Sequence, residues 1–109
     1  MEINNEKSGL LKLCEAIVKF EDANSCARFF EDLCTPGELG AMVGRWQVAL
    51  MLKEKIPYRK INELTGVSTA TITRVARFME AGHGGYKEAL NMIETSNNTE
   101  VQDPQSVEI

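Results

Sequence analysis

Apolar residues recur every three or four positions along most of the chain, a spacing that is typical of amphipathic helices. This spacing, through Leu10 and Ile17, predicts a first helix that ends near Phe20, and a second helix follows that Asp22 or Asn24 can cap. Neither helix can bury its apolar stripe alone. The two stripes must therefore meet each other, the next helix, or another copy of the chain.

A strong helix-start signal follows. Thr35 can act as the N-cap, Pro36 suits the first helical position, and Glu38 completes a capping box. The helix is expected to run to about Lys55. Its apolar residues between positions 39 and 52 cover more than one face, which predicts burial on several sides, as at the centre of a bundle or dimer.

Residues 57–79 predict a helix, a tight turn and a second helix. Gly66 can adopt the positive φ that ends the first helix, and Ser68 can cap the second. Asn62 stands where a small apolar residue usually lets two such helices approach. The expected inner faces consist of Ile61 and Leu64 in the first helix, and of Ile72, Val75 and Met79 in the second.

The opposite face of this helix pair is small, polar and basic, as in helix-turn-helix proteins that read the major groove. The expected base-reading residues are short and open the second helix, whereas the expected phosphate contacts are basic. Helix pairs around a glycine also serve as plain packing units, so a protein-interaction module is the alternative. The expected DNA-binding residues are Arg59, Lys60, Ser68, Thr69, Ala70, Thr73 and Arg77.

The charge distribution supports nucleic-acid binding although the net charge is −4. Residues 1–44 carry a balance of −4 and residues 80–109 a balance of −5, whereas residues 45–79 carry +5. Positive charge is thus gathered on the helix pair and the segment before it, where phosphate contact would need it. A solvated basic face is the alternative explanation.

The segment that follows is expected to finish the fold. Glycines around His83 end the second helix of the motif, and residues 86–93 predict a short last helix. His83 is expected to be an exposed loop residue. Residues 95–109 are polar and acidic without a period and predict a disordered tail. No strand pattern is present, so the sequence predicts an all-α helical bundle, with residues 1–94 as a single domain.

Composition excludes several classes of protein. Of the 109 residues, 43% are hydrophobic, which suits a folded domain, but no apolar run approaches the roughly 20 residues of a membrane span. The N-terminus lacks secretory signal features, so a cytoplasmic location is expected. Cys14, Cys26 and Cys34 form no CxxC pair and are expected to be buried thiols, with no metal site. No nucleophile stands beside a base, so no enzymatic activity is expected; a thiol sensor is a weaker alternative.

The runs LCTPGELGAMVGRW and INELTGVSTATITR resemble the tryptophan repressor family, and most closely its YerC/YecD branch. The similar stretch extends from Phe30 to Leu90. The resemblance implies an intertwined homodimer that presents two helix-turn-helix units to successive turns of a palindromic operator in double-stranded DNA. It thus implies a sequence-specific transcriptional regulator, and specifically a repressor.

The resemblance also implies a co-repressor site, in which two arginines frame an aromatic ring. Arg45 and Arg74 match those arginines, and Thr35 and Thr71 match threonines of the same pocket. Two residues depart from the pattern of the tryptophan-binding members: Val75 replaces a glycine, and Phe78 replaces a serine. Both changes add bulk where the indole would lie, so we expect either no co-repressor or one other than tryptophan. The alternative role for the two arginines is to bind phosphate or to pair with Glu38 or Glu63.

Overall fold

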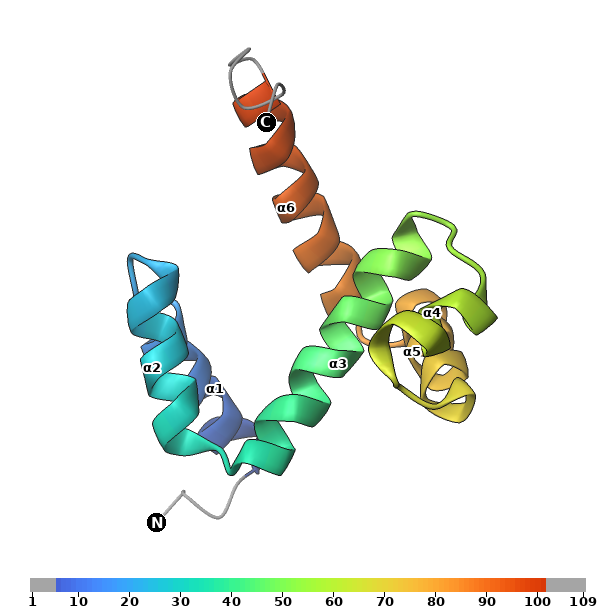
Figure 1. Cartoon of the computed structure of the whole chain (residues 1–109). Coiled ribbons are helices and arrows are strands. Elements are labelled where there is room, and N and C mark those ends of the chain that lie inside the picture. Colours follow the sequence, from blue (N-terminus) through green and yellow to red (C-terminus); the bar gives the residue numbers. More distant parts are fainter. Residues whose placement is uncertain (1–5, 102–109) are drawn as a thin grey trace. The chain divides into compact units, whose positions relative to one another are not determined.

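The computed structural model describes residues 6–101 of the chain, with side chains described for residues 6–95. This part is helical throughout and contains no strand, which confirms the all-α class (Figure 1). By their internal contacts the residues form two compact units, Met1–Ala41 and Met42–Ile109. The single domain expected over residues 1–94 stays a prediction. The helices are α1 (Glu6–Ile17), α2 (Ala23–Leu33), α3 (Pro36–Lys53), α4 (Tyr58–Thr65), α5 (Thr69–Ala81) and α6 (Gly85–Val101).

The first unit contains α1, α2 and the start of α3. Asp22, rather than Asn24, caps α2, because its Oδ1 accepts a hydrogen bond from the Ser25 N–H at 2.8 Å. The rings of Phe20 and Phe29 lie with their centroids 5.4 Å apart. Neither α1 nor α2 contains a fully buried residue, and the apolar residues of both helices are at most half-buried.

The capping box at the start of α3 is confirmed in full. The Glu38 N–H donates to Thr35 Oγ1 at 3.1 Å, and the Thr35 N–H donates to Glu38 Oε1 at 2.9 Å. Pro36 occupies the first helical position, where its missing N–H costs nothing. Two of the donors that a helix start leaves unpaired are thereby satisfied.

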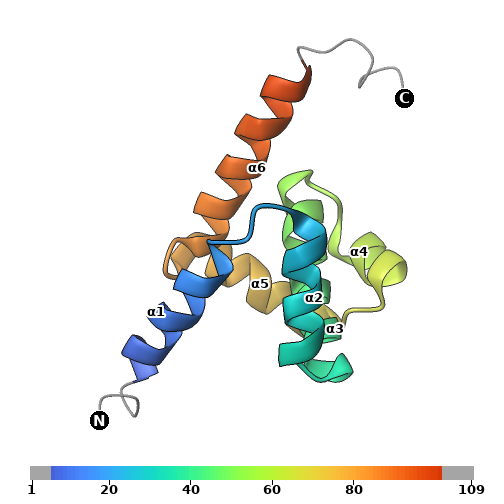
Figure 2. The ribbon, with the colours of Figure 1, turned by 90° about the vertical axis from the view of Figure 1, so that its left-hand side faces the viewer.

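The second unit is built around a small apolar core that α3, α4 and α5 share (Figure 1). Leu90 of α6 is also buried. Figure 2 shows α6 as a long helix that leads away from α4 and α5. The core side chains, all at most 1% exposed, are Val48 and Ala49 from α3, Ile61 from α4, and Ile72 and Val75 from α5.

One burial prediction is wrong and one stays open. Leu64 was expected on the inner face of α4, but 57% of it is exposed, so Ile61 is the core residue of that helix. The expected burial of α3 on several sides, as at the centre of a bundle or dimer, stays a prediction, since only Val48 and Ala49 are buried within the single chain. Val48 and Ala49 of α3 pack against α4 and α5. The rest of the apolar surface of α3 needs another partner.

The last helix is longer than predicted. It runs to Val101 rather than to Ile93, so residues 95–101 of the expected disordered tail are helical. The reason is local: no glycine or proline occurs between Gly85 and Pro104, and serine, threonine and asparagine weaken a helix without ending it. Residues 102–109 of the expected tail lie outside the described residues.

The three cysteines are free thiols, and the prediction that they are buried is wrong. Cys14 is exposed, and Cys26 and Cys34 are half-buried. They belong to α1, α2 and the end of α2, where no residue is fully buried. In the described part of the chain, no three histidine, cysteine or acidic side chains are grouped so that they could hold a metal ion. No described helix is both long and apolar enough to cross a membrane.

Candidate nucleic-acid interface

The turn between α4 and α5 has the predicted geometry. Gly66 adopts φ 78°, and its N–H donates to the Asn62 carbonyl at 2.8 Å, which ends α4. Ser68 then caps α5, because its Oγ accepts a hydrogen bond from the Thr71 N–H at 3.1 Å. A left-handed glycine and a side-chain cap together fix the direction in which α5 leaves α4.

Asn62 has a role that its sequence position did not reveal. Its Nδ2 donates to the Val67 carbonyl at 2.8 Å, across the turn that it precedes. Thr65 assists, because its Oγ1 donates to the Ile61 carbonyl and accepts from the Val67 N–H at 3.0 Å. The polar residue that departed from the expected pattern therefore closes the turn through its own hydrogen bond.

The turn packs closely against α3. A Cβ added at Gly44 of α3 would lie 3.2 Å from Cγ2 of Val67, which is tighter than ordinary van der Waals contact. Gly44 therefore allows α3 to approach the turn between the two helices. The helix pair is thus supported from behind by α3 as well as by the shared core.

The outer face of α5 is exposed in its first turn. Ile72 and Val75 anchor the helix in the core, while Thr69, Ala70 and Thr73 face solvent. Ser68 is also exposed, although its hydroxyl is engaged in the cap. Short side chains on an exposed first turn permit close approach to base edges. The expected base-reading residues therefore lie on one accessible surface.

The basic residues of the helix pair are exposed and are not neutralised by carboxylates. Arg59 and Lys60 occupy the first turn of α4, and Arg77 lies on α5. The ion pair found among the described side chains joins Lys53 to Glu94 at 2.8 Å, on α3 and α6, so it leaves these three cations free of acidic partners. Unpaired cations beside an exposed helix start are what phosphate contact requires.

Most of the expected co-repressor residues make other contacts within the chain, and Arg45 is the exception. Val75 is 1% exposed and belongs to the core. The Arg74 guanidinium lies 4.7 Å from the centroid of the Phe78 ring, so an aromatic ring of the chain itself covers one face of this arginine. Thr71 Oγ1 accepts from Ser68 Oγ at 3.1 Å. Arg45 is exposed on α3, and Thr35, in the first unit, serves the capping box.

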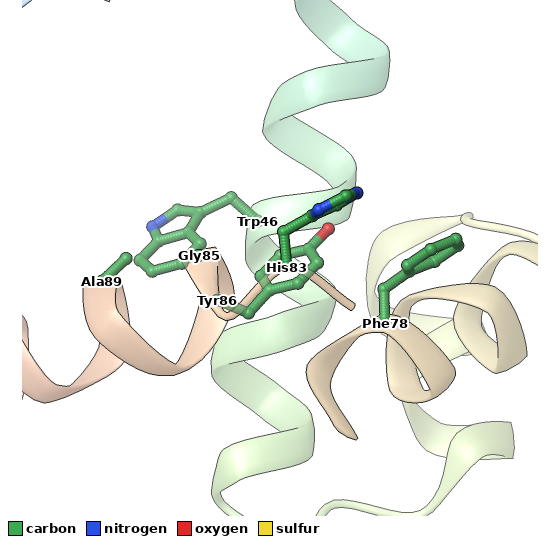
Figure 3. A pocket seen from close by; sticks show the side chains of 6 residues that line it. All are labelled: Trp46, Phe78, His83, Gly85, Tyr86 and Ala89. Atoms are coloured by element: carbon green, nitrogen blue, oxygen red, sulfur yellow. The ribbon is translucent and has the colours of Figure 1, made fainter. Parts of the chain in front are cut away.

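A pocket that the sequence did not predict lies between α3, α5 and α6 (Figure 3). Its volume is about 390 Å³, and aromatic rings form most of its wall. Trp46 comes from α3, and Tyr86 comes from the start of α6, after the glycine-rich segment. The signal in the sequence was the cluster of glycines before Tyr86, which brings α6 back beside α3. The lining residues are Trp46, Phe78, His83, Gly85, Tyr86 and Ala89.

Comparison with known proteins gives a consistent result. The family described as Trp repressor protein matches residues 8–94. The uncharacterized protein YerC of Bacillus subtilis (strain 168) is 43% identical over 82 residues, which cover 75% of this chain and 79% of that protein. The crystal structure of a TrpR-like protein from Eubacterium eligens ATCC 27750 is 38% identical, with a TM-score of 0.74 over 80% of this chain and 90% of that one. A protein from Staphylococcus aureus, provisionally named a Trp repressor, is 37% identical, with a TM-score of 0.76 over 86% and 95%.

Proposed function

This chain belongs to the Trp repressor family, a family of regulators rather than enzymes, and we propose that it is a sequence-specific DNA-binding repressor of transcription. In this proposal α5 enters the major groove of a palindromic operator and α4 rests on the backbone. A cytoplasmic location belongs to the same proposal, because the operator lies on the chromosome.

One observation carries the proposal: the first turn of α5 is largely exposed, largely polar and held in place by several contacts. Ser68 caps it, Ile72 and Val75 anchor it, and Asn62 fixes the turn before it. A fixed position matters because a recognition helix must hold its side chains in register with base edges. The free cations Arg59, Lys60 and Arg77 flank this surface and supply the electrostatic part of binding.

The proposal includes a homodimer. Large apolar side chains of the first unit remain open: Leu10 is 56% exposed, Leu11 52%, Val18 75% and Leu33 50%. A folded chain rarely leaves so much apolar surface in water, so a second copy is expected to cover it. Two symmetric helix-turn-helix units would then lie about 34 Å apart and bind two half-sites of one operator.

The experiment that tests the function is selection of bound sequences from a random DNA duplex pool with the full chain, followed by affinity measurement at several salt concentrations. We expect enrichment of a palindromic sequence and a steep loss of affinity as salt rises, because phosphate contacts release counterions. Failure to enrich any sequence, with weak and salt-insensitive binding, would favour the protein-interaction module instead. A parallel selection with a panel of metabolites would reveal an effector.

A further inference from the structure

Arg74 and Phe78 form a stacked pair on the outer side of α5. The residues are four positions apart, so they lie above one another on the helix, and the guanidinium carbon is 4.7 Å from the ring centroid. Arg74 is exposed and, within the residues whose side chains are described, has no ion pair. Stacking occupies the face of a guanidinium and leaves its five N–H donors, which lie in the plane, free for another acceptor.

The Phe78 ring lies close to the glycine that ends α5. A Cβ added at Gly82 would lie 3.1 Å from Phe78 Cδ1 and 2.5 Å from the Phe78 carbonyl oxygen, so the glycine at the end of α5 makes room for this residue. The ring also forms one wall of the pocket that contains His83 and Tyr86 (Figure 3). A half-buried ring can orient the side chain stacked on it.

Arg74 belongs to the same exposed side of α5 as the expected DNA contacts. It lies one helical turn after Ala70 and one turn before Arg77, and all three are exposed. It lies beyond the first turn of α5, in the part of a recognition helix that is nearer to the backbone than to the bases. The acceptor within its reach is therefore a phosphate oxygen.

We infer that Arg74 is a further DNA-contacting residue that binds a phosphate, and that Phe78 is the positioning residue that holds its guanidinium edge-on toward the duplex. This inference rests on the proposed function. For Arg74 it selects phosphate binding over the co-repressor role, and it gives Phe78 a part in the DNA-binding surface. The aromatic ring that stacks on Arg74 belongs to the chain itself, so this arrangement needs no bound aromatic co-repressor.

The test measures the affinity of the full chain for its selected duplex in four variants. Arg74→Ala should weaken binding roughly tenfold on every sequence, and should reduce the salt slope by about 1. Phe78→Leu keeps an apolar side chain but removes the ring face, so it should weaken binding about two- to fivefold. Phe78→Tyr keeps the face and should stay within about twofold of the unmodified chain. Lys87→Ala removes an exposed positive charge from α6 and serves as the control.

The decisive comparison is Phe78→Leu in the Arg74→Ala background. If Phe78 acts through Arg74, the double variant should bind no worse than Arg74→Ala alone. If Phe78→Leu weakens binding in the Arg74→Ala background as much as it does in the unmodified chain, Phe78 has a purely structural role and the inference is overturned. The inference is also overturned if Phe78→Leu binds the operator with unchanged affinity. The proposed function would then still stand. If the unmodified chain binds no duplex, the proposed function and this inference both fail.

Discussion

The side-chain amide of Asn62 spans the turn of the helix-turn-helix and donates to the Val67 carbonyl at 2.8 Å. Most turns of this kind rely on a small apolar residue at that position to bring the two helices together. Here the Asn62 amide forms a hydrogen bond instead, and it acts on Val67, whose Cγ2 would lie 3.2 Å from a Cβ added at Gly44 of α3. The Asn62 amide therefore helps to set the orientation of α5, together with Gly66 and the Ser68 cap.

Replacing this amide should weaken the fold. Asn62→Ala removes the donor and leaves the partly buried Val67 carbonyl without it, so we expect the free energy of unfolding to fall by about 1–2 kcal/mol. Denaturant unfolding followed by circular dichroism measures this. Asn91→Ala, on the exposed side of α6, is the matched control and should change stability by less than about 0.5 kcal/mol. Equal stability of both variants would show that the bond contributes nothing.

Two glycine-to-alanine changes should have opposite effects. At Gly66 the φ of 78° is the problem, because an added Cβ would meet no atom within 4 Å, and left-handed backbone costs an L-residue about 1–2 kcal/mol. Gly40 lies inside α3, where an added Cβ also meets nothing, so alanine should stabilise the helix by up to about 1 kcal/mol. Thermal unfolding of the two variants should therefore shift in opposite directions; a gain at Gly66 would contradict the geometry of the turn.

Base reading and phosphate contact should be separable by mutation. Thr73→Val keeps the shape of an exposed α5 side chain but removes its hydroxyl, so the preferred base at one position of each half-site should change. Arg59→Ala should instead weaken all duplexes alike and lower the salt slope by about 1. Repeating the duplex selection with each variant distinguishes the two roles. Uniform losses from both changes would reject the division.

The chain should be an obligate dimer. The uncovered faces of α1 and α2 leave the first unit without a buried residue, so a folded monomer would lack a core in that region. Analytical ultracentrifugation at micromolar concentration should give twice the chain mass of 12.1 kDa. Leu10→Glu, on the exposed stripe, should shift the equilibrium toward the monomer. A folded monomer of the unmodified chain at that concentration would refute the dimer.

L-Tryptophan should not bind at micromolar concentrations. Val75 fills the core beside α5, and Phe78 already covers one face of Arg74, so an indole has no free place there. Calorimetry with the full chain tests this directly. Val75→Gly should improve tryptophan binding if steric closure is the cause, but the same change removes a core side chain and should lower the free energy of unfolding by about 2–4 kcal/mol. The titration must therefore be made well below the melting temperature of that variant.

Local features of the fold could be predicted from the sequence because short segments determine them. The capping box at Thr35 and Glu38, the left-handed Gly66 and the Ser68 cap each depend on neighbours within three or four residues. Leu64 shows where the pattern fails, since helical spacing alone did not distinguish it from the buried Ile61. The end of α6 was missed because polar composition was interpreted as disorder although no helix breaker was present.

The candidate site was predictable in its outline but not in its contacts. The exposed face of α5 follows from the positions of Ile72 and Val75. The stacking of Arg74 on Phe78 could not be deduced, because a spacing of four residues permits contact without requiring it. The pocket beside Trp46 depends on where the glycine-rich segment directs α6, which local sequence does not determine.

The absence of any buried residue in α1 and α2 has a consequence for how the regulator would respond to its own abundance. Fixing the backbone of each residue costs about 1–2 kcal/mol, and within this unit little apolar burial offsets it. If the second copy supplies that burial, the active species forms in proportion to the square of the chain concentration at low expression. A twofold change in synthesis would then change operator occupancy by up to about fourfold. Such a chain could act as a dosage-sensitive switch even without an effector.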